Sequence, residues 1–168
     1  ECVTGLDLVE LQLRLAAGEA LALEQADIRQ QGHAFECRIC AEQPEHDFRP
    51  ATGSVQRLRI PRGERVRFDG GLVEGQAVTA AFDSMLAKLI TTGADRRDSA
   101  ARMRQALREF VLLGVDHNAD YLARIFAHEA FLGGELHTGF VVEHAAALAP
   151  ATLSVEERAA VLIAAALG

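Results

Sequence analysis

The chain has 168 residues, of which 49% are hydrophobic and 24% charged, and its formal net charge is −7 at pH 7. This length suffices for one domain with a buried core, and this balance is typical of a globular protein rather than a disordered one. The acidic excess and the scattered arginines argue against a nucleic-acid surface, which needs clustered basic residues. The most apolar run, 159–167, is much shorter than the ~20 residues that a membrane-spanning helix requires, so we expect no membrane partner.

The cysteine content and the first residues predict a reducing, cytoplasmic location. The three cysteines, Cys2, Cys37 and Cys40, are an odd number, and the first residues lack the basic and apolar regions of a secretory signal. The chain does not begin with Met and runs at once into a helical pattern, so we expect it to be a piece of a longer protein.

The first half of the chain predicts one helix followed by strands. Thr4 with Asp7 has the spacing of a helix cap and its acidic partner, and leucines at helical spacing follow as far as Gly18. A short helical turn is expected at 24–29. Apolar and polar residues alternate over 33–42, which is typical of a half-buried strand. Further strands are expected at 55–60, 65–69, 73–80 and 86–92.

The second half of the chain predicts mainly helices. The clearest spans 95–110, where Asp95 or Asp98 caps the start and a row of arginines faces solvent. Its inward side is expected to carry Ala101, Met103, Leu107 and Phe110. A short strand at 111–115, a helix at 118–128, a compact segment at 131–142 and a last helix capped by Ser154 with Glu157 follow. One helix, then antiparallel strands, then helices favour an α+β fold over a doubly wound sheet.

Cys37 and Cys40 have the two-residue spacing of many metal-binding thiols, and His33 and His46 lie near them in the sequence. Positions three apart on a strand point to opposite faces, and there is no second cysteine pair. We therefore favour a core thiol at Cys37 and a surface or interface thiol at Cys40 over a zinc or redox site.

Arg38 lies in the middle of the same strand, on its less apolar face, between Glu36 and Glu42. One interpretation is a surface ion pair, worth ~0–1 kcal/mol. The other is a guanidinium that a rigid strand presents to a planar anion, which arginine can hold with two hydrogen bonds. The residues alone favour the ion pair and leave the anion site open.

Three further features of the sequence give no indication of a catalytic role. Asp83, at a strand corner, is by itself a turn former. His137 has no recognisable nucleophile partner, so a helix cap or a packing role is expected. The chain contains no glycine-rich phosphate loop. From the residues alone, the chain is an α+β domain with one candidate anion-binding arginine.

Several collinear segments resemble the biotin carboxylase component of biotin-dependent carboxylases. They are 4–9 (TGLDLV), 16–18 (AAG), 32–39 (GHAFECRI), 50–53 (PATG), 83–90 (DSMLAKLI), 101–107 (ARMRQAL) and 137–140 (HTGF). Together they cover roughly residues 1 to 144, in the order and spacing of the family. This number of collinear segments is specific, whereas any one of them alone would be weak.

The resemblance implies an ATP-dependent ligase that uses bicarbonate to carboxylate N1 of biotin on a carrier protein. It implies a mainly antiparallel sheet with flanking helices, preceded by the last helix of an ATP-grasp domain. The implied boundaries are 1–32 for the end of the ATP-grasp domain, 33–144 for the C-terminal domain, and 145–168 for a linker and the start of a following helical segment.

The resemblance also implies roles for two residues. Arg38 matches the strand arginine that in the family faces bicarbonate and the biotin ureido group, so its implied catalytic role is to stabilise negative charge. Asp83 matches an aspartate near the active-site mouth and is implied to contribute to substrate binding. The family's phosphate- and magnesium-binding residues precede the segment that matches Glu1. Biotin, ATP and Mg are therefore expected in the intact parent, and the chain alone is expected to bind no cofactor and to be inactive.

Two positions depart from the family pattern. Cys40 stands where the family usually has Asn, and Glu64 stands where a bacterial subunit has an aromatic residue at its dimer contact, although Arg67 fits. The implied partners are the ATP-grasp half, a biotin carboxyl carrier domain, a second copy in a homodimer and a carboxyltransferase subunit.

We favour an acyl-CoA carboxylase alpha chain, acting with acetyl-, propionyl- or methylcrotonyl-CoA, because the tail after His144 resembles a linker toward a carrier domain. Two alternatives stay open. The chain could be the equivalent piece of pyruvate or urea carboxylase. It could also be a non-catalytic binding or oligomerisation module that keeps the fold.

Overall fold

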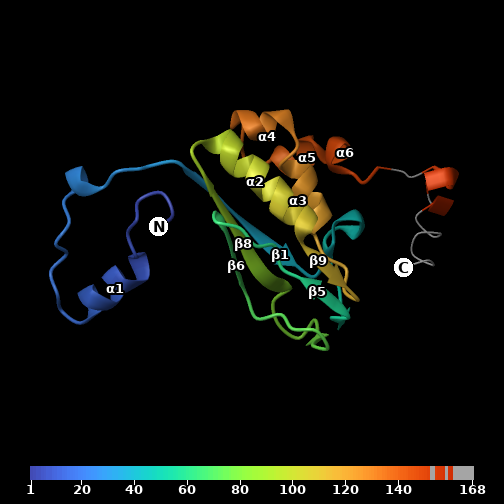
Figure 1. Cartoon of the computed structure of the whole chain (residues 1–168), viewed down its shortest axis with the longest axis horizontal. Coiled ribbons are helices and arrows are strands. Elements are labelled where there is room, and N and C mark those ends of the chain that lie inside the picture. Colours follow the sequence, from blue (N-terminus) through green and yellow to red (C-terminus); the bar gives the residue numbers. More distant parts are fainter. Residues whose placement is uncertain (152–153, 158, 161–168) are drawn as a thin grey trace.

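The computed structural model describes residues 1–151, 154–157 and 159–160. Figure 1 shows a body in which helices cover one face of a sheet, with the N-terminal segment to one side and the C-terminal tail beyond the other. Among the described residues, no helix has the length and apolarity to cross a membrane. Strands precede helices in the body, so the predicted α+β class is confirmed.

The centre of the body is a three-stranded antiparallel sheet with the order β1-β8-β6. β1 (His33–Cys40) pairs with β8 (Met85–Gly93), and β6 (Val66–Gly70) pairs with the other edge of β8. The alternation predicted for β1 is confirmed, since Cys37 and Ile39 lie in the core at 5% and 0% exposure. The register shifts between Ile39 and Cys40, whose partners are Ala87 and Met85, so Leu86 is an extra residue and β8 bulges at this point.

Three two-stranded sheets extend one end of the body. They are β2 (Glu42–Gln43) with β3 (Arg49–Pro50), β4 (Gly53–Ser54) with β7 (Ala77–Val78), and β5 (Arg57–Arg59) with β9 (Val111–Leu113). The strand expected at 73–80 is reduced to β7, because a turn closed by the Gln76 N–H to the Val73 carbonyl occupies its first half. A 3₁₀ turn, η2 (Pro44–His46), connects β2 to β3.

Helix α2 (Arg96–Glu109) lies against the inner face of the central sheet, and Asp95, one of the two predicted caps, is the residue that caps it. Its buried residues are Ser99, Ala100, Met103, Ala106 and Leu107. The prediction that Ala101 faces inward was wrong, since Ala101 is exposed. Ala100 takes that position instead, because it lies three residues before Met103 and shares its face.

The predicted row of solvated arginines on α2 is confirmed only in part. Arg102 pairs with Asp98 at 3.0 Å on the outer side, as expected. Arg96 instead lies over the ring of Phe35 at 4.9 Å, and its Nη2 donates to the carbonyl of Phe131 at 2.7 Å. The start of α2 is therefore tied to both the sheet and the following helices.

Helix α2 reaches the sheet most closely at Gly93, where an added Cβ would overlap the backbone of Ser99 and lie 2.8 Å from its Cα. We expect Gly93→Ala to lower the free energy of unfolding by about 1–3 kcal/mol, because helix and strand must move apart. Urea unfolding measures this. Gly71→Ala is the matched control, since a Cβ there meets nothing within 4 Å. Equal stability of the two variants would contradict this packing.

The remaining helices pack beside α2 and at one end of the body (Figure 1). They are α3 (Ala119–Ile125), α4 (Glu129–Gly133), α5 (Phe140–Glu143) and α6 (Ala145–Leu148). Phe126 joins α3 to the sheet by edge contact with Phe35, with ring centroids 4.9 Å apart. His137 accepts from the Gly139 N–H at 3.1 Å through Nδ1, so it braces the start of α5, in line with its expected packing role.

The N-terminal segment contains α1 (Leu8–Ala16) and the 3₁₀ turn η1 (Gln25–Asp27). The cap of α1 is Asp7, which accepts from the Glu10 N–H at 2.9 Å, so the prediction of Thr4 as the cap was wrong. None of the residues of α1 is buried, and four of its apolar side chains are 46–67% exposed. Much of the apolar surface of this helix is therefore exposed.

The expected capping of a last helix is confirmed. The Ser154 N–H donates to Glu157 at 2.8 Å, and the Glu157 N–H donates to the Ser154 hydroxyl at 3.2 Å. This is the reciprocal arrangement of a capping box. Most of the tail beyond it lies outside the described residues.

Candidate functional site

The face of the central sheet that points away from α2 carries five charged side chains, which we call the charged face. They are Glu36 and Arg38 from β1, Lys88 from β8, and Arg67 and Asp69 from β6. Their positions alternate with core residues along each strand. The strand register places Arg38 directly opposite Lys88, and Lys88 directly opposite Asp69.

Four of these five charges form two pairs. The Nη2 of Arg67 lies 2.6 Å from Asp69, and the Nζ of Lys88 lies 3.9 Å from Glu36. The Arg67 hydrogen bonds hold the pKa of Asp69 below its usual range, so Asp69 stays ionised. The charged face therefore has two internally compensated pairs and one remaining cation.

That remaining cation is Arg38, whose side chain is exposed. Among the described residues no ion pair includes Arg38, so the structure does not support the ion-pair interpretation. Side chains directly opposite on paired strands have Cβ atoms about 4.5–5.5 Å apart, and like charges there repel. An anion between Arg38 and Lys88 would relieve this repulsion, and a guanidinium can hold a planar anion through two hydrogen bonds.

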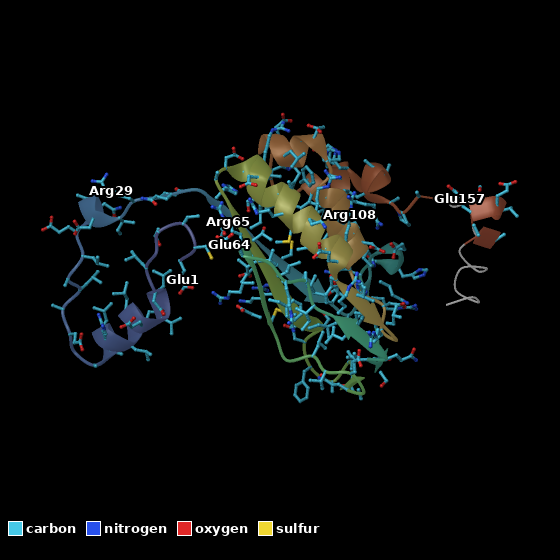
Figure 2. The ribbon with its side chains drawn as sticks, viewed as in Figure 1. Glu1, Arg29, Glu64, Arg65, Arg108 and Glu157 are labelled. Atoms are coloured by element: carbon cyan, nitrogen blue, oxygen red, sulfur yellow. The ribbon has the colours of Figure 1, made fainter. Side chains whose placement is uncertain are left out.

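The N-terminal segment lies beside the charged face. Glu1, Cys2 and Val3 line the same hollow as Arg67 and Lys88, with a volume of about 430 Å³. Figure 2 shows Glu1 on the side of the body that carries Glu64 and Arg65, whereas Glu157 lies beyond the opposite side. The start of the chain and the charged face therefore belong to one region of the molecule.

The loop before β8 is held against the end of β1. The Ala41 N–H donates to the Ser84 carbonyl at 2.8 Å, and the Ser84 hydroxyl donates to Glu42 at 2.7 Å. Asp83 is exposed and accepts from the Met85 N–H at 3.2 Å, which is the turn-forming role expected from its residue type. The structure thus places Asp83 beside the end of β1, but engaged with its own turn.

The two thiols of β1 point to opposite faces, as predicted. Burial raises the pKa of Cys37 to about 12, and burial with the nearby Glu42 carboxylate raises the pKa of Cys40. The described residues contain no group of three His, Cys, Asp or Glu side chains placed to hold a metal. His33 instead packs against Phe35, with ring centroids 4.8 Å apart.

This arrangement predicts a strict order of thiol reactivity, because the thiolate is the reactive form and must also be accessible. At pH 8 we expect the exposed Cys2 to react first with a thiol reagent, Cys40 more slowly, and Cys37 only after unfolding. Mass spectrometry of alkylated peptides measures this order, and Cys2→Ser should remove the fast phase. Equal labelling of Cys37 and Cys2 in the folded chain would contradict the burial of β1.

The structure adds residues to this region that sequence reasoning missed. Lys88, the single lysine of the chain, was given no role in the sequence analysis, because the register that places it opposite Arg38 is not visible in the sequence. Asn118 was expected only within a helix, yet its side chain bonds to the backbone on both sides of Ile39. A polar residue before a helix predicts a cap, and no local signal indicates a partner about 80 positions earlier.

The sequence model of the biotin carboxylase C-terminal domain family matches residues 36–143. The chain is 45% identical over 144 residues to a pyruvate carboxylase subunit of Methanothermobacter thermautotrophicus, covering 86% of the chain and 29% of that protein. It is 40% identical over 151 residues to the alpha chain of the mouse mitochondrial methylcrotonoyl-CoA carboxylase, covering 89% and 21%. The chain therefore spans less than a third of the length of these curated relatives.

Solved structures agree with this match. The biotin carboxylase domain dimer of Hydrogenobacter thermophilus 2-oxoglutarate carboxylase, in complex with MgADP, ADP and bicarbonate, superposes with a TM-score of 0.84 at 35% identity. That superposition covers 89% of this chain and 33% of that one. The biotin carboxylase subunit of a pyruvate carboxylase gives the same TM-score at 36% identity, covering 89% and 33%. The chain belongs to the biotin carboxylase C-terminal domain family.

Proposed function

We propose that the chain is the C-terminal part of a biotin carboxylase component, which uses ATP and bicarbonate to carboxylate N1 of biotin on a carrier protein. The observation that carries this proposal is the exposed guanidinium of Arg38, which a strand presents on the charged face and which has no ion-pair partner among the described residues. A solved relative is described as a complex with MgADP and bicarbonate, which supports an anion as the ligand of this region.

In this proposal Arg38 is the catalytic residue of the chain. Its guanidinium stabilises the negative charge that develops on carboxyphosphate and on the ureido oxygen of biotin. Lys88, opposite Arg38, adds positive potential at the site. The Glu36 carboxylate, which pairs with Lys88, reduces that potential. Asp83, in the loop before β8 and beside the end of β1, contributes to substrate binding at the mouth of the site.

The proposed domain boundaries are those of the family. Residues 1–32 would end the ATP-grasp domain, 33–144 would form the C-terminal domain, and 145–168 would begin the following segment. The family match over residues 36–143 supports the proposed start and end of the C-terminal domain, 33 and 144. The exposed apolar side chains of α1 support a missing partner surface, since contiguous exposed apolar area marks an interaction site.

ATP and magnesium would be held by the missing half rather than by this chain. No group of three potential metal ligands occurs in the described part, and Lys88 is already paired with Glu36. Neither feature fits a nucleotide–magnesium site. The proposed partners are the ATP-grasp half, a biotin carboxyl carrier domain, a second copy and a carboxyltransferase subunit. A solved relative is described as a dimer.

The identity of the molecule that finally receives the carboxyl group, an acyl-CoA or pyruvate, is a separate proposal. We favour an acyl-CoA carboxylase, and a curated relative named for methylcrotonoyl-CoA supports it. The relative named for pyruvate supports the second candidate, pyruvate carboxylase. The cytoplasmic location stays a prediction.

The test is reconstitution with a separately expressed ATP-grasp half of a relative. The isolated chain should cleave no ATP, and the mixture should cleave ATP only when both bicarbonate and biotin are present. Analytical ultracentrifugation and circular dichroism would establish that both halves are folded and associated. Inactivity of such a folded, associated mixture would favour the non-catalytic module.

A further inference from the structure

Asn118 makes the densest set of polar contacts to the backbone around Arg38. Its Nδ2 donates to the Arg38 carbonyl at 3.1 Å, and its Oδ1 accepts from the Cys40 N–H at 3.0 Å. Its own N–H donates to the Cys40 carbonyl at 3.2 Å. Asn118 is only 7% exposed, so these bonds are shielded from water.

These contacts replace a missing neighbouring strand. β1 is an edge strand of the central sheet and pairs only with β8 within the part of the chain that the structure describes, so no neighbouring strand there bonds to its other edge. Asn118 satisfies backbone groups on this edge at the point where the register of β1 shifts, between Ile39 and Cys40. The two bonded groups are the carbonyl of Arg38 itself and the N–H two residues later, so Asn118 holds the backbone from which the Arg38 side chain projects.

The Asn118 side chain bonds to β1 and does not cap its own helix. It occupies the N-cap position of α3, where an asparagine side chain normally accepts from a helix N–H, yet it makes no such bond. The Ala119 N–H donates instead to Nδ1 of His117 at 3.3 Å. The backbone carbonyl of Asn118 accepts from the Leu122 N–H at 3.0 Å, which fixes Asn118 to α3.

We infer that Asn118 is a positioning residue that fixes the β1 backbone from Arg38 to Cys40 and thereby aims Arg38 at its anionic substrate. This inference rests on the proposed function, which gives Arg38 its catalytic role. Loss of the Asn118 amide removes two hydrogen bonds from this strand edge, and the backbone that carries Arg38 becomes less restrained. Small displacements of a catalytic group cost on the order of tenfold to a hundredfold in rate.

The first measurement uses the chain alone and requires no activity. Amide hydrogen exchange by NMR should show faster exchange of the Cys40 N–H in Asn118→Ala than in the wild type, with the Leu89 N–H as the reference. Asn118→Asp keeps an acceptor for the Cys40 N–H but has no N–H for the Arg38 carbonyl. It should shift the Arg38 and Ile39 resonances while protecting the Cys40 N–H. Unchanged Cys40 exchange in Asn118→Ala would overturn the inference.

The second measurement is a double-mutant cycle in the reconstituted enzyme. Asn118→Ala should lower kcat by about tenfold to a hundredfold and leave the KM for ATP unchanged, because the other half binds ATP. In an Arg38→Ala background the same change should have no further effect on kcat. An equal loss in both backgrounds would overturn the inference, because Asn118 would then act independently of Arg38.

Ser99→Ala is the matched control. The buried Ser99 hydroxyl donates to the Thr91 carbonyl at 3.1 Å, and this bond lies on the α2 side of the sheet, opposite the charged face. This substitution should lower stability without lowering kcat. If the proposed function itself is wrong, a different result is expected: the single substitution Arg38→Ala leaves kcat unchanged. The hydrogen-exchange result then decides the positioning role alone.

Discussion

Leu89→Ala should lower the free energy of unfolding by about 2–5 kcal/mol, because it removes a large apolar side chain from the centre of the core. Leu89 is 0% exposed and lies on β8, the middle strand of the central sheet. It stands opposite Cys37 on β1 and Phe68 on β6, so the cavity would touch all three strands. Urea unfolding followed by circular dichroism measures the change.

The matched control for this variant is Leu113→Ala, at a side chain that is 54% exposed on β9. It makes the same chemical change where little apolar surface is buried, so a loss below about 1 kcal/mol is expected. Similar losses for the two variants would mean that Leu89 is not in a close-packed core.

Arg38→Ala should lower the biotin-dependent ATP cleavage of the reconstituted enzyme by about 10²–10³-fold in kcat, as expected for loss of a donor to a developing negative charge. The folded state should be little affected, since Arg38 is exposed and forms no ion pair among the described residues. Arg38→Lys should restore only part of the activity, because an ammonium group cannot hold a planar anion in the bidentate way.

Two controls accompany the Arg38 variants. Cys40→Ala, two residues further along β1, should retain activity because the proposed chemistry does not use its thiol. Arg57→Ala removes an exposed arginine from β5, outside the charged face, and should also be active. Equal losses for Arg38→Ala and Arg57→Ala would indicate a general charge effect instead of a specific role for Arg38.

The elements with a clear period were predictable from the sequence. Alternation over β1 placed Cys37 and Ile39 in the core, and both are buried. Asp95 before a helical pattern predicted the cap of α2. In contrast, Ala101 was assigned to the wrong side, because alanines on several faces of α2 leave the boundary of its apolar stripe poorly defined.

The candidate site was predictable only in part, because its geometry depends on long-range pairing. Arg38 was identified from the polar side of one strand and from the family resemblance. Its neighbour Lys88 is 50 positions away and comes into place through the register of β1 with β8. Asn118 reaches the same strand from the start of α3, where its residue type predicts a local cap instead.

The most direct measurement follows the carboxyl group itself. The chain and a separately expressed ATP-grasp half would be mixed with ATP, labelled bicarbonate and biotin, and the label on biotin would be measured. We expect carboxylated biotin only when both halves and ATP are present, and a loss of about 10²–10³-fold in its rate of formation with Arg38→Ala. Unlabelled biotin from folded, associated halves, or full labelling with Arg38→Ala, would contradict a role for the charged face in biotin carboxylation.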